Sequence, residues 1–502
     1  MLCALVAACV VWLATKDGAV LMPDSMSYVG AAESLHTRGA LRIPMADWND
    51  ADSTSSLKQF PPGYSIVLAA AQQLGASALQ APRIIAAFAA LTSILLLIAL
   101  LVRCEVGWWS LAAPLVILSV RGVTTGALTA LSESLFVVTV LLTLYHMVRY
   151  PQRPWTYGIA AACASMVRYV GVGLVVSAVA YALAYTWRGA RQYLTRRDVI
   201  RRDVKRALGA AVLAGTPGVI VIGVWQLRAR ANAVSTPMTD LRWSGNPSAA
   251  LREGLHTVVS QIAPVGVHAS AQSLLAAIVG IALLRNVVRA WRAPNDALRR
   301  LMTASLLLAA ALSAVILYAR LFVGDAIPFD DRILAPALLC AIIAAFSATL
   351  RVSRWRGKTV AVAWLAVAAV ASISNAANVM TEREDYGAAS WQQGASAQWL
   401  RANANGCTVF TNDPVAVYFA TGRPSRVLPT SVAIDSVQQF GAHLRATHGL
   451  IVQYPAAFID MADAGTTARA IGLTATHFAD STIVWTNTLA PCPSLPTSHH
   501  TL

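Results

Sequence analysis

The sequence predicts an α-helical polytopic membrane protein with about eleven transmembrane helices and a small C-terminal α/β extracytoplasmic domain. Of the 502 residues, 56% are hydrophobic and only 13% are charged, whereas soluble proteins contain about a quarter charged residues. Long apolar stretches recur between clusters of arginine as far as Ala377. Beyond that point the composition changes to short, alternating strand-like and helical segments.

The apolar stretches define the expected transmembrane helices, for which about 17–25 residues are needed. We expect spans near 1–15, 82–102, 107–121, 134–148, 155–167, 170–187, 207–225, 273–290, 301–319, 333–350 and 359–377. The first is short and lacks a basic leading segment, so a cleaved signal peptide is an alternative. The stretch 155–167 runs into Arg168, so it and the next span are alternatively one long or re-entrant segment.

The basic residues report the orientation of these spans. The net charge of +15 would suggest nucleic acid as a partner if the chain were soluble. With a cytoplasmic N-terminus, however, about half of the 39 lysines and arginines fall in the short cytoplasmic connections, as the positive-inside rule requires. We therefore expect membrane lipids around the chain, no nucleic acid as a partner, and an extracytoplasmic C-terminus.

Two domains follow from this division. Residues 1–377 form the transmembrane domain, with a first outer loop at about 16–81, and residues 378–502 form the α/β domain. In this tail, 450–454 and 482–485 resemble buried strands. Cys407 and Cys492 are its only cysteines. An oxidising compartment would favour a disulfide between them, and two buried free thiols are the alternative.

Three ionisable residues lie at the expected outer ends of spans. Asp24 follows the first span and is a candidate general base, or alternatively caps the helix that starts near Ser25. Glu133 heads the fourth span, where an acid either stabilises the helix dipole or takes part in chemistry. Arg168 lies between two apolar stretches, a position that indicates a functional site, with snorkelling to the lipid head groups as the alternative.

Further candidates lie on the same expected face. Arg332 is a candidate phosphate ligand, or alternatively pairs with Asp330 or Asp331. Lys58 is a candidate ligand or a solvated loop cation. The expected topology places all the charged candidates on the outer face: Asp24, Lys58, Glu133, Arg168, Asp330, Asp331 and Arg332. The sequence contains no phosphate-binding loop of the Walker type, no nucleophile elbow and no zinc-ligand spacing.

The order of these motifs resembles that of the C-type (GT-C) membrane glycosyltransferases, which include the protein O-mannosyltransferases and the aminoarabinose transferases. The similar stretches are 24–28, 31–39, 60–64, 131–135, 167–171, 330–336, 399–401 and 412–414. Ser25 stands where the family often has a second acid. The resemblance covers most of the chain and implies a GT-C-like fold in a bacterial inner (plasma) membrane.

The resemblance also implies an activity. A sugar would move, with inversion, from a polyprenyl-phosphate-linked donor to a hydroxyl on a lipid, polysaccharide or protein acceptor. Asp24 and Glu133 would be the catalytic residues. The lipid phosphate or sugar would be bound by five side chains: Lys58, Tyr64, Arg168, Tyr169 and Arg332. No cofactor follows from the sequence, although arginine or a bound divalent metal must stabilise the departing phosphate.

Two other functions are consistent with many of the same features. A transporter or flippase of lipid-linked sugars would explain the spans and Arg168, but not the polar first loop or the α/β tail. Internal repeats would favour a transporter, and the sequence shows none. A surface-polysaccharide ligase or polymerase would use similar donors, but would typically have a long outer loop late in the chain.

Overall fold

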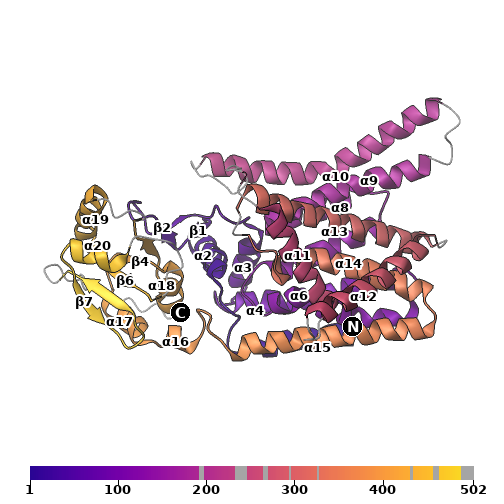
Figure 1. Ribbon diagram of the computed structural model, residues 1–502. Helices are drawn as coiled ribbons and strands as arrows, with labels where there is room; N and C mark the ends of the chain where they lie inside the picture. Colours follow the sequence, from indigo (N-terminus) through magenta and orange to yellow (C-terminus); the bar gives the residue numbers. More distant parts are fainter. Residues whose placement is uncertain are drawn as a thin grey trace.

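The structure is a long helical bundle with an α/β layer at one end. It is a computed structural model, which describes residues 1–190, 197–231, 243, 246–263, 269–292, 295–324, 327–429, 434–455 and 463–487. Helices α2 (Pro23–Arg38) and α3 (Gly63–Gln73), drawn in violet, lie between the bundle and the yellow C-terminal layer (Figure 1). The first outer loop is therefore the part of the chain that joins the two regions.

Every predicted span coincides with helical structure. The matching elements are α1 (Leu2–Ala14), α4 (Ala81–Arg103), the 3-10 turn η1 (Gly107–Ala112) with α5 (Ala113–Leu118), α7 (Glu133–Arg149), α8 (Pro154–Val167), α9 (Val172–Ala190), α10 (Arg197–Ala231), α12 (Ala269–Trp291), α13 (Asp296–Phe322), α14 (Asp331–Val352) and α15 (Trp355–Thr381). Within the described residues, seven helices are long and apolar enough to cross a membrane, and α1 and η1–α5 are shorter apolar helices. The chain is a multi-pass membrane protein.

The link between α8 and α9 is broken at Arg168. This residue has an extended backbone (φ −147°, ψ 143°), and the 3-10 turn η2 (Tyr169–Gly171) follows it. A Cβ on Gly171 would lie 2.5 Å from the carbonyl oxygen of Ala164, so only glycine lets this turn fold back against α8. The alternative of one long segment is therefore wrong, and Arg168 lies half-buried at the junction of the two helices.

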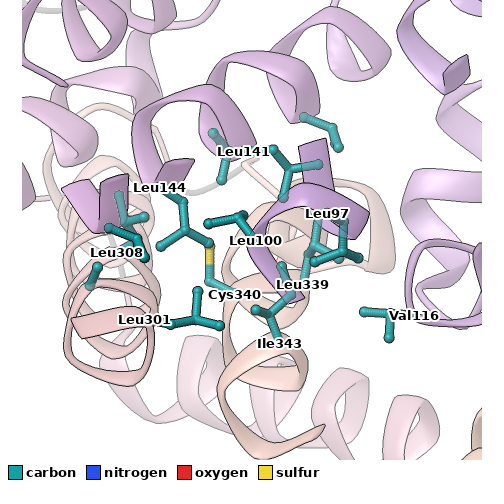
Figure 2. Close-up of a cluster of buried hydrophobic side chains, with 14 of the residues drawn as sticks. Leu97, Leu100, Val116, Leu141, Leu144, Leu301, Leu308, Leu339, Cys340 and Ile343 are labelled. Carbon is teal, nitrogen blue, oxygen red and sulfur yellow. The ribbon is translucent and has the colours of Figure 1, made fainter. Parts of the chain in front are cut away.

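The bundle core is made of branched aliphatic side chains from five helices. Figure 2 shows Leu97 and Leu100 of α4 among side chains of α5, α7, α13 and α14. Leu144 and Leu308 are fully buried in this cluster. Because lipid tails are as apolar as leucine, close van der Waals packing holds such helices together. This packing fixes the positions of the helix ends that form the site described below.

Two further helices lie outside the predicted spans. The short α6 (Arg121–Gly126) follows α5, and α11 (Pro247–Ile262) lies between α10 and α12. A Cβ on Gly122 would lie 2.0 Å from the carbonyl oxygen of Asp331, so glycine allows α6 to pack directly on the start of α14. Gln261 of α11 donates to the carbonyl of Ser119 and accepts from the backbone of Arg121.

The C-terminal layer contains a six-stranded sheet with the order β2-β5-β4-β6-β8-β7. Its strands are β2 (Met45–Ala46), β4 (Val409–Thr411), β5 (Ser425–Val427), β6 (Leu450–Gln453), β7 (Thr474–His477) and β8 (Ile483–Thr486). Its helices are α16 (Ala389–Gln392), α17 (Ala395–Asn403), α18 (Pro414–Thr421), α19 (Ile434–Ala446) and α20 (Ala464–Ala470). The strands expected at 450–454 and 482–485 are confirmed. Strand β2 comes from the first outer loop and pairs in parallel with β5.

The first outer loop and the tail share more than this strand. The loop also forms a small antiparallel pair from β1 (Arg42–Ile43) and β3 (Ser55–Ser56). The hydroxyl of Tyr418 in α18 donates to Glu33 of α2 at 2.6 Å. The backbone of Leu21 donates to Asp385 at 2.7 Å. The tail is therefore anchored on the first loop and helps to fix the position of α2.

The structure tests one half of the predicted disulfide between Cys407 and Cys492. Cys407 is disulfide-bonded, whereas Cys492, its expected partner, lies outside the described residues. The membrane-domain cysteines are free thiols, namely Cys3, Cys9, Cys104, Cys163 and Cys340. The alternative that Cys407 is a free thiol is therefore wrong.

Candidate active site

Four charged side chains meet at the end of the bundle that faces α2 and the tail. Asp24 lies in the first turn of α2, and Glu133 is the first residue of α7. Arg168 lies at the α8–α9 junction, and Arg332 lies in the first turn of α14. Each is at a helix end, where polar groups reach the membrane surface. The sequence separates them by up to about 300 residues, and the fold brings them together.

Glu133 links both arginines. Its Oε1 lies 2.6 Å from Nη1 of Arg168 and 3.7 Å from Nε of Arg332. Its side chain is only 7% exposed, and its other oxygen, Oε2, is buried without a hydrogen-bond partner among the described residues. A Cβ on Gly126 would lie 2.9 Å from Cβ of Glu133, so a glycine in α6 makes room for this acid.

Asp24 is the more accessible acid of the site. Its Oδ2 lies 3.8 Å from Nη1 of Arg332, and its side chain is 36% exposed. Partial burial raises the pKa of the Asp24 carboxyl, the positive charge of Arg332 opposes this, and the negative charge of Glu133 adds to it. The net direction is a raised pKa, which makes the carboxylate a better proton acceptor.

Asp24 does not cap its helix. The helix begins at Pro23, and the side chain of Ser25 accepts a hydrogen bond from the backbone of Met22 at 2.9 Å. The alternative interpretation of Asp24 as a helix cap is therefore wrong. Ser25 is the third residue of α2, and its hydroxyl satisfies the backbone N–H of the N-cap residue Met22.

An aromatic layer supports the arginine side of the site. Arg168 donates to the hydroxyl of Ser132 at 3.3 Å, and the hydroxyls of Ser132 and Tyr28 are 3.1 Å apart. The Tyr28 ring packs against Phe60 and edge-on against Tyr64, with centroids 4.8 and 5.2 Å away. Tyr64 is only 1% exposed. Tyr64 therefore lies behind Tyr28, where it packs the loop, and its expected contact with the substrate stays a prediction.

The side chain of Tyr169 contacts the backbone of Lys58. The hydroxyl of Tyr169 donates to the carbonyl of Lys58 at 3.2 Å and accepts from the indole nitrogen of Trp225 at 3.0 Å. The side chain of Lys58 is exposed. This chain of hydrogen bonds ties the first outer loop to α10, so both residues lie beside the site and Tyr169 holds the loop.

The two aspartates before Arg332 have other partners. Asp330 caps α14 by accepting from the backbone of Ile333 at 2.8 Å. Asp331 pairs with Arg121 at 2.8 Å. The hypothesis that Arg332 pairs with one of them is therefore wrong. Arg332 instead extends to Asp24 and Glu133.

The charged side chains of this site are better suited to bind an anion than a metal cation. Across the described ranges, no three His, Cys, Asp or Glu side chains gather closely enough to hold a metal ion. Both acids of the site face arginine, and Arg168 and Arg332 provide planar donors that suit a phosphate.

Sequence reasoning missed four residues that shape the site: Tyr28, Ser132, Arg121 and Trp225. Tyr28 and Ser132 flank the predicted residues in the same short motifs, so their proximity was a usable signal. Arg121 and Trp225 were at the edges of expected spans, and hydropathy gives no sign of a specific partner there.

Comparison with solved structures identifies the fold. The structure of ArnT from Cupriavidus metallidurans bound to undecaprenyl phosphate matches with a TM-score of 0.60 and 14% identity, over 98% of this chain and 99% of that chain. The chain has a GT-C glycosyltransferase fold. AftD, an arabinofuranosyltransferase from Mycobacteria, matches with a TM-score of 0.47 and 17% identity, over 96% of this chain and 41% of that chain. No protein-family model and no curated protein matches the sequence.

The GT-C fold confirms the fold class expected from the order of the motifs. The match covers nearly the whole of both chains, so the tail is part of the shared architecture. The four charged residues thus lie in a GT-C fold at helix ends, beside the first outer loop.

Proposed function

We propose that this chain is a membrane glycosyltransferase that moves a sugar, with inversion, from a polyprenyl-phosphate-linked donor to a hydroxyl acceptor. The observation behind this proposal is the meeting of Asp24, Glu133, Arg168 and Arg332 at one end of the bundle. Two arginines and an accessible carboxylate are the groups that such a reaction needs. We place the reaction at the outer face of a bacterial inner membrane, with the N-terminus in the cytoplasm. The reason is that the short loops at the end of the bundle opposite to the site are rich in arginine, as is typical of cytoplasmic loops.

The arginines account for donor binding and for stabilisation of the leaving group. When the bond between the sugar carbon and the phosphate oxygen breaks, its electron pair remains on the phosphate. Arg168 and Arg332 would donate charge-assisted hydrogen bonds to that phosphate. Glu133 holds both guanidinium groups through one oxygen. We assign Glu133 the positioning of the two cations, since its 7% exposed side chain leaves little room for a reacting atom.

Asp24 accounts for activation of the acceptor. The acceptor oxygen would form the new bond on the face of the sugar carbon opposite to the leaving phosphate, which inverts that carbon. The hydroxyl proton would pass to Asp24, whose partly exposed carboxylate has a raised pKa. Arg332 contacts Asp24 and therefore lies between the base and the phosphate side of the site.

The shared fold supports the choice of donor. ArnT, with which this chain aligns over nearly its full length, has been solved bound to undecaprenyl phosphate. A polyprenyl tail must stay in the bilayer, and the charged cluster lies at helix ends, where a lipid phosphate would be found.

Binding of undecaprenyl phosphate to the purified protein in nanodiscs tests the donor assignment. We expect Arg332→Gln and Arg168→Gln to weaken binding by at least about tenfold, since each removes a charged hydrogen-bond donor. Asp24→Asn should bind normally. Arg354→Gln is the matched control, because this exposed arginine lies at the start of α15, at the opposite end of the bundle. Equal binding by the wild type and both site variants would contradict the assignment.

A further inference from the structure

The segment that leads into Asp24 is held by the first residues of the tail. Residues 17–21 follow α1 and belong to no helix or named strand. The backbone N–H of Leu21 donates to Oδ2 of Asp385 at 2.7 Å, and the backbone of Tyr386 donates to the Leu21 carbonyl at 3.3 Å. Both backbone polar groups of Leu21, three residues before Asp24, are therefore bound by the tail.

Arg383 holds the rest of the same segment. Its guanidinium donates to three consecutive carbonyl oxygens, those of Asp17 at 3.2 Å, Gly18 at 3.5 Å and Ala19 at 3.4 Å. It also binds the Asp385 carboxylate in a bidentate pair, with Nε 2.9 Å from Oδ1 and Nη2 3.1 Å from Oδ2. Such charge-assisted, two-point contacts are among the strongest polar contacts in proteins. We refer to Arg383 and Asp385 as the 383–385 clamp.

The 383–385 clamp is buried, and a glycine leaves room for it. The Asp385 side chain is only 5% exposed. Burial alone would raise the pKa of Asp385, but hydrogen bonds from Arg383 and from the backbone of Leu21 and Gly387 hold it below its usual value. A Cβ on Gly387 would lie 2.6 Å from Nη2 of Arg383 and 2.9 Å from Oδ2 of Asp385. A side chain at position 387 would therefore displace the clamp.

The same segment is also bonded to the loop that leads to Glu133. The backbone of Val20 donates to the carbonyl of Leu128 and accepts from the backbone of Ala130, both at 2.9 Å. Val20 lies four residues before Asp24, and Ala130 lies three residues before Glu133. The two acids of the site are therefore carried by chain segments that are bonded to each other, and the clamp fixes one of these segments to the tail.

The carboxylate of Asp24 is held only loosely by its ion pair with Arg332. The 3.8 Å between Oδ2 and Nη1 is longer than a hydrogen bond, so the backbone before α2 largely sets where the carboxylate lies. A general base must come within about 2.6–3.2 Å of the oxygen whose proton it accepts. A misplacement of about 1 Å can lower a rate by about 10²-fold.

We propose that Arg383 and Asp385 are positioning residues for the base, which fix the backbone before α2 so that Asp24 faces Arg332 and the acceptor hydroxyl. This inference rests on the proposed function. Neither residue of the clamp takes part in the proton transfer, because both act through the backbone of residues 17–21. The tail is thus needed for transfer and not for binding of the donor phosphate.

Asp385→Ala tests this inference in the full chain in proteoliposomes, with a panel of polyprenyl-phosphate sugars as donors. The variant removes the acceptor of Leu21 and the partner of Arg383. We expect transfer to fall by about 10²-fold and binding of undecaprenyl phosphate to be unchanged. Asp385→Asn keeps an oxygen for Leu21 and should retain more transfer than Asp385→Ala.

Asp480→Ala is the matched control. Asp480 also accepts backbone hydrogen bonds, from Ser396 at 3.0 Å and from Thr482 at 3.2 Å, and both partners belong to the tail. Its loss disturbs the tail without removing a contact to residues 17–21, so we expect transfer at the wild-type rate. Where Asp385→Ala does not fold, Gly387→Ala gives the same comparison, because it crowds the clamp and keeps both charges.

Two further readouts separate positioning from a general loss of stability. Adding Asp385→Ala to Asp24→Asn should cost little further transfer, because the clamp acts through Asp24. In the single variant, the acid limb of the pH profile should move to higher pH. Burial raises the pKa of Asp24, and Arg332 opposes this only while the two side chains are close.

Three results would overturn the inference. The first is wild-type transfer by folded Asp385→Ala, and the second is an equal loss of donor binding and transfer, which would mean that the clamp only maintains the fold. The third is a full, independent loss when Asp385→Ala is added to Asp24→Asn. Wild-type transfer by Asp24→Asn would instead contradict the proposed base, so the two failures are distinguishable.

Discussion

Among the individual residues of the site, Glu133 has two arginine partners and almost no exposure. Replacing it with glutamine keeps the shape and removes the charge. Because breaking a buried ion pair leaves its partner uncompensated, we expect a loss of about 3 kcal/mol of stability. Undecaprenyl phosphate binding should also weaken, since both guanidinium groups lose their anchor.

Thermal unfolding and lipid binding of Glu133→Gln, measured in the same preparation, check this expectation. Glu105→Gln is the control, because Glu105 is an exposed acid at the opposite end of α4 from the site. A Glu133→Gln protein with wild-type stability and binding would show that the acid does not position the arginines.

The pH dependence of transfer reports on Asp24. Its pKa is raised by burial and held down by Arg332. A general base must be ionised, so transfer is lost as the pH falls through the pKa of Asp24 in the folded protein. We expect Arg332→Gln to shift this acid limb to higher pH, because it removes the cation that lowers the pKa. An acid limb at the same pH in both proteins would contradict the assignment of Asp24.

At the scale of elements, hydropathy predicted the helices well and the contacts between them poorly. Long apolar stretches must become helices in a bilayer, because the backbone has no other way to satisfy its hydrogen bonds there. Strand β2 was not predictable, since it has only two residues and pairs with a strand almost 400 residues away. The partner of Arg332 was likewise hidden, because chain spacing favoured its neighbours Asp330 and Asp331.

The start of α18 provides a prediction about stability. Asp413 caps this helix and is almost fully buried. Burial raises the pKa of Asp413 to about 6, although hydrogen bonds from the Ala416 backbone and Tyr386 oppose the shift. The folded state therefore binds the proton more tightly than the unfolded chain, so this group's contribution to stability falls as pH rises from about 4 through about 6.

Asp413→Asn keeps a capping oxygen and removes the titration. We expect the melting temperature of the variant, relative to wild type, to increase between about pH 5 and about pH 7. Thermal unfolding in detergent measures the difference at both pH values. A constant offset between the two proteins would contradict a raised pKa at this position.

At the scale of the whole molecule, the sequence predicted which face the charged candidates share, but not their mutual contacts. Asp24, Glu133, Arg168 and Arg332 do converge, whereas Tyr64 is buried behind Tyr28. Hydropathy places helix ends on one side of a membrane. It does not give the rotation of a helix, on which the direction of each side chain depends.

The orientation in the membrane is a prediction about the whole chain. We expect a membrane-impermeant maleimide to label Ala51→Cys in intact cells and to leave Arg354→Cys unlabelled until the membrane is opened. Ala51 lies in the first outer loop and Arg354 lies between α14 and α15, and both are exposed. Labelling of Arg354→Cys in intact cells would invert the topology.

The central claim is that Asp24 removes the acceptor proton at a site where two arginines hold the lipid phosphate. The most direct measurement compares sugar transfer by the wild type and Asp24→Asn in proteoliposomes, with a panel of polyprenyl-phosphate sugars as donors and undecaprenyl phosphate binding measured in parallel. We expect binding to be unchanged and transfer to fall by about 10²–10⁴-fold. Transfer at the wild-type rate by Asp24→Asn, with binding intact, would contradict the account.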